Sequence, residues 1–382
     1  MPRRESVPNS AVFAAVVASA VACAFGQGRS AEEMFRQAQA ASRQNDYARA
    51  ERLYREILAG DPTILSARVN LGLACYWQSK PRAALAEFQK ALEMRPREFS
   101  ALLFSGLAYI DLTEYDRAQA MLEQARELNN GDPLLFWALG SLAMIHNDAN
   151  AAVPALERCA ELDPNNVRCR WLLGSAYAML AYGAQKPSVR ANYGERVDAT
   201  LAWMREHQPN SALLHVFQGD VFAARTSTDE ALREYQQAQA LDPDWPDIHL
   251  LIGSLLGLQG RFDEAKAELK RQLTLHPGDT RALVESGSVS CRATHYAEAV
   301  PLLKEALSRD ANNYEANYRL GQAYLSLEKA PAAVAYLERA ARVRPEKSSS
   351  YYLLYRAYRT LGQREKAAGA LATFRKLKSA GG

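Results

Sequence analysis

The chain has 382 residues, of which 48% are hydrophobic and 23% charged, and its formal net charge is +3. These values are typical of a folded globular protein, and they argue against a disordered chain and against a general electrostatic attraction to nucleic acid or membranes. A chain of this length ordinarily forms two or three domains with separate cores, unless it contains an internal repeat.

The N-terminus has the features of an export signal. Arg3 and Arg4 precede an uncharged, mainly apolar run at residues 11–25, which is short for a membrane span but suits the central region of a secretory signal. Small residues allow three cleavage points, which are after Ala24, after Gly26 or before Cys23. Cleavage at the last point would leave a cysteine open to lipidation. We expect residues 1–26 to be a signal peptide or export segment, with an uncleaved anchor or a buried helix as the alternatives.

A 34-residue repeat fills the remainder, residues 27–382. Glycines recur at this period, with one longer step of 45, at residues 72, 106, 140, 174, 219, 253, 287 and 321. Prolines and alanines form two further ladders in the same register. Apolar residues within each repeat recur at spacings of three and four, which predicts two amphipathic helices, and the glycines let those helices approach closely. We expect ten repeats, starting at residues 31, 65, 99, 133, 167, 212, 246, 280, 314 and 348.

This pattern resembles the tetratricopeptide repeat. The ninth repeat has the residues typical of that family at their expected offsets, namely Leu320, Gly321, Tyr324, Ala333, Leu337, Ala340 and Pro345. The resemblance covers nearly everything after the N-terminal segment. It implies an all-α, right-handed superhelical solenoid of antiparallel helix pairs, in which each pair buries its apolar face only against its neighbours. We therefore expect one continuous array instead of several domains.

The resemblance also implies a partner-binding groove on the concave surface, formed mainly by the first helix of each repeat. The fifth position of that helix is apolar or aromatic throughout, and with two residues at the next position it defines a candidate groove: Phe35, Val69, Leu103, Phe104, Trp137, Trp171, Val216, Phe217, Leu250, Tyr318 and Tyr352. A large exposed apolar patch usually marks a binding surface with aromatic anchors. The alternative is that this stripe is core, packed between adjacent helices.

Two specialised forms of recognition are disfavoured. Tetratricopeptide domains that hold a free C-terminal carboxylate use a lysine and asparagines that are missing here, and the asparagine ladder of repeats in glycosyltransferases that modify serine and threonine is also missing. Recognition of apolar or mixed peptides remains. The six histidines are scattered without zinc-binding spacing, and neither a phosphate loop nor a nucleophile elbow occurs. We expect no enzymatic activity, cofactor or metal.

The fifth repeat contains the extra residues, around 181–192. We expect a longer turn there, followed by a second helix extended at its start near Pro187 and Ser188. Such an insertion is either a tolerated surface feature or a contact for a specific partner.

Two further features bear on compartment and partners. Cys159 ends one repeat and Cys169 opens the next, so in an oxidising compartment they can form a disulfide if their Cα atoms lie within about 7 Å. Residues 351–382 carry seven basic side chains against Glu365 alone. This basic repeat is either a solvated terminal helix or a contact for anionic lipid or an acidic partner.

The expected function is therefore an exported protein-interaction scaffold. It would bind a peptide or a partner protein in the periplasm or at the cell envelope and act as an assembly or secretion factor. We expect it to bind no nucleic acid. Membrane contact would come only through the export segment, lipidation of Cys23 or the basic C-terminal repeat. Secreted and lipid-anchored forms are alternatives for the compartment. An accessory subunit that regulates an enzyme complex or recruits its substrates is the alternative for the function.

Overall fold

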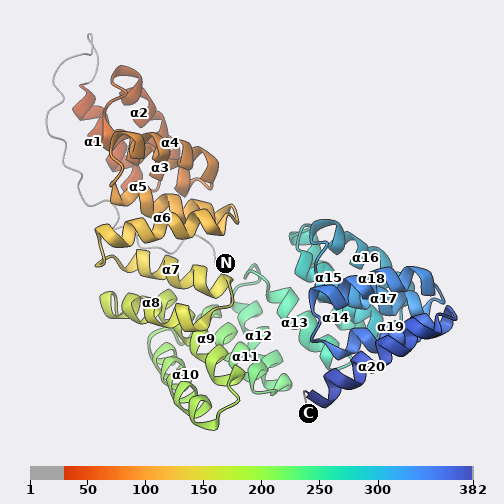
Figure 1. The fold of residues 1–382 in the computed structure, drawn as a ribbon. Helices are drawn as coiled ribbons and strands as arrows, with labels where there is room; N and C mark the ends of the chain where they lie inside the picture. The colour runs from red at the N-terminus through yellow and green to blue at the C-terminus, as the bar shows by residue number, and fades with distance from the viewer. Residues whose placement is uncertain (1–29, 381–382) are drawn as a thin grey trace. The chain divides into compact units, whose positions relative to one another are not determined.

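The computed structural model describes residues 30–380, which contain twenty helices and no strand. The expected export segment, residues 1–26, lies outside the described residues. The chain divides into two compact units that meet in the sequence between Pro209 and Asn210, here called the N-terminal array and the C-terminal array (Figure 1). Each array consists of consecutive antiparallel helix pairs, so the prediction of an all-α repeat fold is confirmed.

The N-terminal array contains five helix pairs: α1 (Ala31–Arg43) with α2 (Tyr47–Gly60), α3 (Leu65–Trp77) with α4 (Pro81–Met94), α5 (Phe99–Asp111) with α6 (Tyr115–Leu128), α7 (Pro133–Ile145) with α8 (Ala149–Leu162), and α9 (Val167–Gly183) with α10 (Pro187–His207). The C-terminal array contains the other five: α11 (Ala212–Ala224) with α12 (Thr228–Leu241), α13 (Ile248–Leu258) with α14 (Phe262–Leu275), α15 (Thr280–Arg292) with α16 (Tyr296–Arg309), α17 (Tyr314–Ser326) with α18 (Ala330–Val343), and α19 (Ser348–Thr360) with α20 (Arg364–Ala380).

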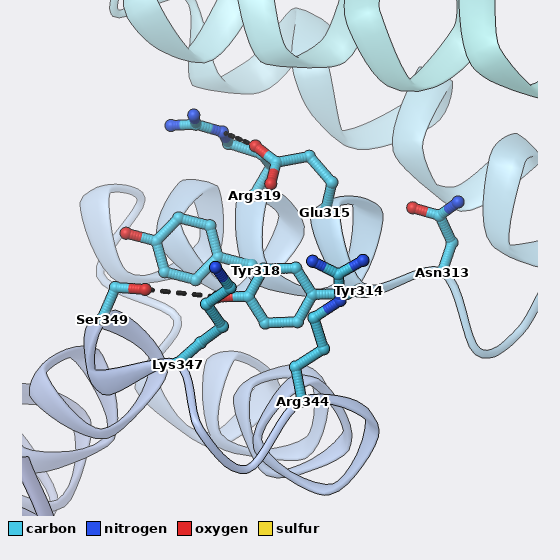
Figure 2. A pocket seen from close by; sticks show the side chains of 8 residues that line it. All are labelled: Asn313, Tyr314, Glu315, Tyr318, Arg319, Arg344, Lys347 and Ser349. Carbon is cyan, nitrogen blue, oxygen red and sulfur yellow. Dashed lines mark hydrogen bonds and ion pairs between the residues drawn. The ribbon is translucent and has the colours of Figure 1, made fainter. Parts of the chain in front are cut away.

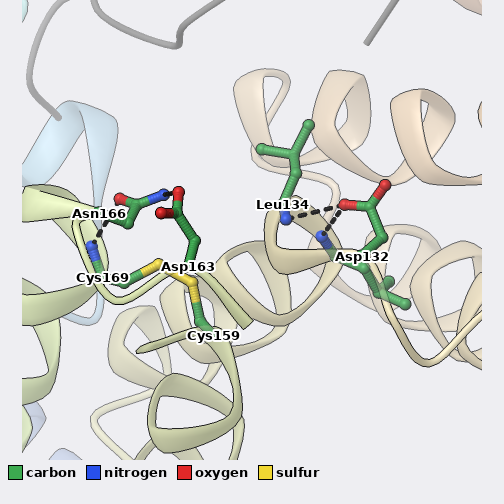
Figure 3. Close-up of a disulfide and its surroundings, with 7 residues drawn as sticks. Asp132, Leu134, Cys159, Asp163, Asn166 and Cys169 are labelled. Atoms are coloured by element: carbon green, nitrogen blue, oxygen red, sulfur yellow. Dashed lines mark hydrogen bonds between the residues drawn. A yellow bond between two sulfur atoms is a disulfide. The ribbon is translucent and has the colours of Figure 1, made fainter. Parts of the chain in front are cut away.

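The first helices begin at the start of their repeats, except in the seventh. There α13 begins at Ile248, two residues after the expected start, because Asp247 adopts a left-handed conformation with φ 67° that a helix cannot contain. Side-chain caps set several of the other starts. Asp132 accepts a hydrogen bond of 2.8 Å from the backbone N–H of Leu134 at the start of α7 (Figure 3), which satisfies a donor that the helix leaves unpaired.

The glycine ladder marks the closest approach of the two helices in a pair. A Cβ atom at Gly287 in α15 would lie 2.5 Å from Cγ of Leu303 in α16. That distance is too short for a van der Waals contact, so only glycine allows the two helices to cross this closely.

The insertion lengthens both helices of the fifth repeat. Helix α9 has 17 residues where α7 has 13, and α10 has 21 where α8 has 14. The turn between α9 and α10 comprises residues 184–186, the same length as the turn at residues 44–46 between α1 and α2. The expected longer turn is therefore wrong, because the extra residues continue the helical pattern on both sides of it.

An ion-pair and aromatic network fastens the extended α10 to its neighbours. Arg196 of α10 donates a 2.7 Å hydrogen bond to the carboxylate of Glu157 in α8, and the hydroxyl of Tyr177 in α9 donates another of 2.7 Å to the same oxygen. The Arg196 guanidinium also lies over the Tyr177 ring, 5.3 Å from its centroid.

Across residues 30–380, no helix has both the length and the apolar character needed to cross a bilayer.

Candidate partner-binding site

Most residues of the expected groove lie in the core. Seven are buried, with at most 9% of their surface exposed: Phe35, Val69, Leu103, Phe104, Val216, Phe217 and Leu250. Phe104 shows the reason. Its ring centroid lies 5.4 Å from that of Tyr76 and 6.4 Å from that of Phe88, and both of these residues belong to the preceding repeat. The fifth and sixth positions thus hold neighbouring repeats together, and these seven side chains offer no surface to a partner.

The remaining four residues reach the surface to different degrees. Trp137 and Trp171 are half-buried on α7 and α9 of the N-terminal array. Tyr318 is half-buried on α17, and Tyr352 on α19 is 44% exposed.

Tyr318 lines a pocket of about 520 Å³ in the C-terminal array. The pocket lies between α17, the turn that follows α18, and the start of α19 (Figure 2). We call it the α17–α19 pocket, and its lining residues are Asn313, Tyr314, Glu315, Tyr318, Arg319, Arg344, Lys347 and Ser349.

Hydrogen bonds fix the backbone around this pocket. Asn313 caps α17 by accepting a 3.0 Å hydrogen bond from the N–H of Ala316. The fully buried Asn317 donates through its side-chain amide to the carbonyls of Ala311 at 3.0 Å and Asn313 at 2.8 Å. The turn before α17 is therefore held in one conformation, and it sets the direction in which the tyrosines of α17 point.

Two tyrosines and two arginines form the wall of the pocket. The rings of Tyr314 and Tyr318 are nearly parallel, 11° apart in plane, with centroids separated by 6.0 Å. The Arg344 guanidinium lies 5.5 Å from the Tyr314 centroid, and that of Arg319 lies 5.5 Å from the Tyr318 centroid. Burial raises the pKa of Tyr318, while the nearby positive charge of Arg319 acts in the opposite direction. A cation held over an aromatic face keeps its N–H groups available at its edge.

The charge of the pocket is predominantly positive. Glu315 is its one acidic lining residue, and it accepts a 2.7 Å hydrogen bond from Arg319. Arg344 and Lys347 extend toward the tyrosine rings (Figure 2), and neither forms an ion pair with a described residue. The pocket is therefore suited to a ligand that carries negative charge.

Sequence reasoning identified Tyr318 but missed Tyr314, Arg344 and Lys347. Arg344 and Lys347 lie just before the basic stretch at residues 351–382. Tyr314 precedes Tyr318 by four residues, which places the two rings on one face of a helix, and this spacing was the available signal.

A smaller cavity of about 280 Å³ lies in the N-terminal array between α6, α7 and α8. Its floor is apolar and includes Phe136, Leu139 and Pro154, while Gln119, Glu123 and Arg126 form a polar edge. Trp137 follows Phe136 in α7 but does not line this cavity.

Cys159 and Cys169 form a disulfide that joins α8 to α9, with their Cα atoms 6.1 Å apart (Figure 3). The pairing that the spacing allowed is therefore present. Cys75 and Cys291 are buried free thiols.

The histidines found in the arrays serve packing or lie at the surface. His215 pairs with Glu234 at 2.7 Å, and one repeat later His249 pairs with Glu268 at 2.6 Å, so the same cross-helix contact is made twice. Within the part of the chain that the structure describes, no three His, Cys, Asp or Glu side chains are placed to hold a metal ion.

Comparison with protein-family models gives matches over both arrays. Models described as tetratricopeptide repeat match residues 35–98, 78–133, 105–167, 246–279 and 292–357, and a model described as TPR repeat matches residues 219–260. Together these stretches cover more than half of the chain.

Curated relatives and solved structures are similar to the chain at low sequence identity. The BBSome complex member BBS4 of Bos taurus is 24% identical over 264 residues, which is 69% of this chain and 49% of that protein. The chain thus spans about half the length of this relative. A tetratricopeptide repeat protein from Parabacteroides merdae superimposes with a TM-score of 0.56 at 17% identity, covering 69% of this chain and 99% of its own. A structure of the APC/C hetero-tetramer Cut9-Hcn1 superimposes with a TM-score of 0.51 at 14% identity, and the match covers 92% of this chain and 81% of that one. At these identities the structures show the shared fold alone.

Proposed function

Because the chain belongs to the tetratricopeptide-repeat family, we propose that it is an exported adaptor that binds a partner protein in the α17–α19 pocket. Members of this family present helix faces to peptides and proteins, and they act by holding a partner without transforming it. The observation that carries the proposal is the pocket itself, in which Tyr318 occupies the predicted groove position.

The pocket has the features of a protein-binding site. Its aromatic rings and arginines are the side chains that most often anchor a protein interface. Asn317 fixes the backbone of the turn before α17 in the free protein, so that turn loses little conformational freedom on binding. The Bos taurus relative is named as a member of a complex, which supports a role inside an assembly for this chain as well.

Two observations support the export part of the proposal. Residues 1–26 combine Arg3 and Arg4 with an apolar run of the length of a secretory signal. The disulfide between Cys159 and Cys169 is a bond that persists mainly in oxidising compartments.

Affinity capture tests the binding part. The purified chain without residues 1–29, immobilised in an envelope extract of the source cells, is expected to retain a partner. A variant with Tyr314→Ala and Tyr318→Ala is expected to lose it, and Lys347→Glu, an exposed change that leaves the core intact, is expected to weaken it. Arg375→Ala with Lys376→Ala, on α20 and outside the pocket, serves as the control. Retention of the same partner by all variants would contradict the proposed site.

A reporter fusion tests the export part. Residues 1–29 are joined to a phosphatase that is active only after its own disulfides form. We expect activity with the native segment and loss of activity when Arg3 and Arg4 are both changed to Glu. Equal activity from both fusions would contradict an export signal.

A further inference from the structure

We propose that the partner segment held in the α17–α19 pocket is acidic, an extended peptide whose Asp or Glu side chains contact Arg344, Lys347 and two neighbouring arginines, Arg339 and Arg342. This inference rests on the proposed function, because it names the chemistry of the segment that the adaptor binds. It differs from recognition of a free C-terminal carboxylate, because the acidic groups that it requires are side chains.

The first argument is that these four cations have no carboxylate partner among residues 30–380. Elsewhere in the C-terminal array, cations are paired across helices: Arg281 meets Asp247 at 2.7 Å and Lys266 meets Glu298 at 2.6 Å. Glu346 lies in the same turn as Arg344 and Lys347, but it is exposed and lines no cavity there. A cluster of like charges is unfavourable until an anion joins it, so the surface is complementary to a ligand with several negative charges.

The second argument is that the four cations line two hollows, whose linings include residues consecutive in the sequence. Arg344 and Lys347 line the α17–α19 pocket, whereas Arg339 and Arg342 line a second cavity of about 450 Å³ with Asn312. The linings of the two cavities are contiguous in the sequence, because Asn312 and Val343 line one, while the residues that follow them, Asn313 and Arg344, line the other. A single small anion can fill only one hollow. An extended peptide can place an acidic side chain in each.

The third argument is that the central cation is held ready for a carboxylate. Tyr314, which lies under the Arg344 guanidinium, has its hydroxyl within 3.2 Å of the Ser349 hydroxyl and 3.3 Å of the Ser350 hydroxyl, both in α19. The ring is thus fixed between α17 and α19, with the guanidinium over it. The N–H groups at the edge of Arg344 remain available for paired hydrogen bonds to a carboxylate.

The shape of the site favours a peptide over a membrane or a nucleic acid. The four cations are divided between two hollows of about 520 and 450 Å³, whereas a lipid surface or a duplex would contact them on one broad face. The basic side chains of the terminal helix α20, among them Arg375 and Lys376, line neither hollow. The two basic groups of the C-terminal repeats can therefore be tested separately.

The test uses the purified chain and fluorescently labelled short peptides whose C-termini are amidated. One peptide alternates Glu and Ser, and the matched peptide alternates Gln and Ser. We expect the Glu peptide to bind and to weaken at high salt, and the Gln peptide to bind at least tenfold more weakly. Changing Arg344 and Lys347 to Gln is expected to weaken binding of the Glu peptide by roughly tenfold or more. Changing Arg375 and Lys376 to Gln is the matched control and is expected to leave binding within about twofold.

A charge-reversed variant separates recognition from a loss of folding. The protein with Arg344→Glu and Lys347→Glu is expected to lose the Glu peptide and to bind a peptide that alternates Lys and Ser. The inference would be overturned if the Glu and Gln peptides bound equally or if neither bound. It would also be overturned if the chain bound anionic lipid vesicles or duplex DNA and only the α20 variant lost that binding. Partner capture by the wild-type chain together with any of these results would leave the adaptor function standing. Absence of capture would instead remove the function on which the inference rests.

Discussion

The hydroxyl of Tyr235 in α12 donates a 2.6 Å hydrogen bond to the carboxylate of Asp220 in α11. Burial of this carboxyl group raises its pKa to about 6, and the hydrogen bond from Tyr235 acts in the opposite direction without cancelling the effect. Asp220 follows Gly219, where a Cβ atom would collide with the Tyr235 ring. The carboxylate is therefore placed at one of the closest crossings in the C-terminal array, where ionisation is costly.

This relationship predicts how stability depends on pH. Because the pKa of Asp220 is higher in the folded chain than the usual value of about 3.9, its favourable contribution is complete below that value and is lost as the pH rises through about 6. We expect Asp220→Asn, which keeps an acceptor for Tyr235, to raise the free energy of unfolding at pH 8 by roughly 1–3 kcal/mol. Denaturant unfolding between pH 4 and 8 measures the change. Asp263→Asn makes the same substitution on the exposed start of α14 as the control, and equal pH profiles for Asp220→Asn and the wild type would contradict the prediction.

Two Gly→Ala changes in the C-terminal array are expected to have opposite effects. At Gly287 the new methyl group meets Leu303, so overpacking should lower the free energy of unfolding by about 1–3 kcal/mol. At Gly369, inside α20, nothing lies within 4 Å of the added Cβ, and the better helix propensity of alanine should raise stability by about 0.5–1 kcal/mol. Thermal and denaturant unfolding compare the two variants. A loss of stability at both positions would show that helix crossing is not what selects glycine at residue 287.

The disulfide predicts the number of free thiols. The denatured chain without residues 1–29 should titrate two thiols, Cys75 and Cys291, because Cys159 and Cys169 are bonded. Reduction should add two more free thiols. It should also destabilise the packing of α8 against α9 by about 2–3 kcal/mol, since the bond closes a short loop. Hydrogen exchange should show the loss of protection in α8 and α9, with α19 and α20 unchanged as an internal control. Four thiols before reduction would contradict the pairing.

Removal of the insertion is expected to be tolerated. Deleting residues 182–192 removes the present turn together with the extra helical residues, and most of the deleted side chains are exposed. A new turn formed from residues 180, 181 and 193 would leave helices of about the length found in the other repeats. The free energy of unfolding should change by less than about 1 kcal/mol. Partner capture should be unchanged, because the proposed site lies in the C-terminal array. Loss of capture by a folded deletion variant would instead identify the insertion as a partner contact.

The helix pairs could be predicted from the sequence because glycines and alanines recur at one period, and each marks a helix crossing. Only the seventh repeat departs from its expected start, where Asp247 interrupts the backbone. The lengths of α9 and α10 could not be predicted, because the extra residues suit a helix and a turn equally well.

The site was only partly predictable. An apolar residue at the fifth helical position suits a buried contact as well as an exposed one, so Leu103 and Tyr318 look alike in the sequence although one is core and the other lines a pocket. Arg344 and Tyr314 lie at opposite ends of one repeat, and their contact exists only once α17 and α18 have folded against each other. The positive pocket therefore becomes visible only in the structure.

Site-specific photo-crosslinking tests the central claim that a partner protein binds at the α17–α19 pocket. A photoreactive phenylalanine derivative replaces Tyr318 in the full chain inside the source cells, and the same derivative at Val189, exposed at the start of α10, serves as the control. We expect illumination to give a covalent adduct with one protein at residue 318 and none at residue 189. Adducts at residue 189 with none at residue 318 would contradict the account.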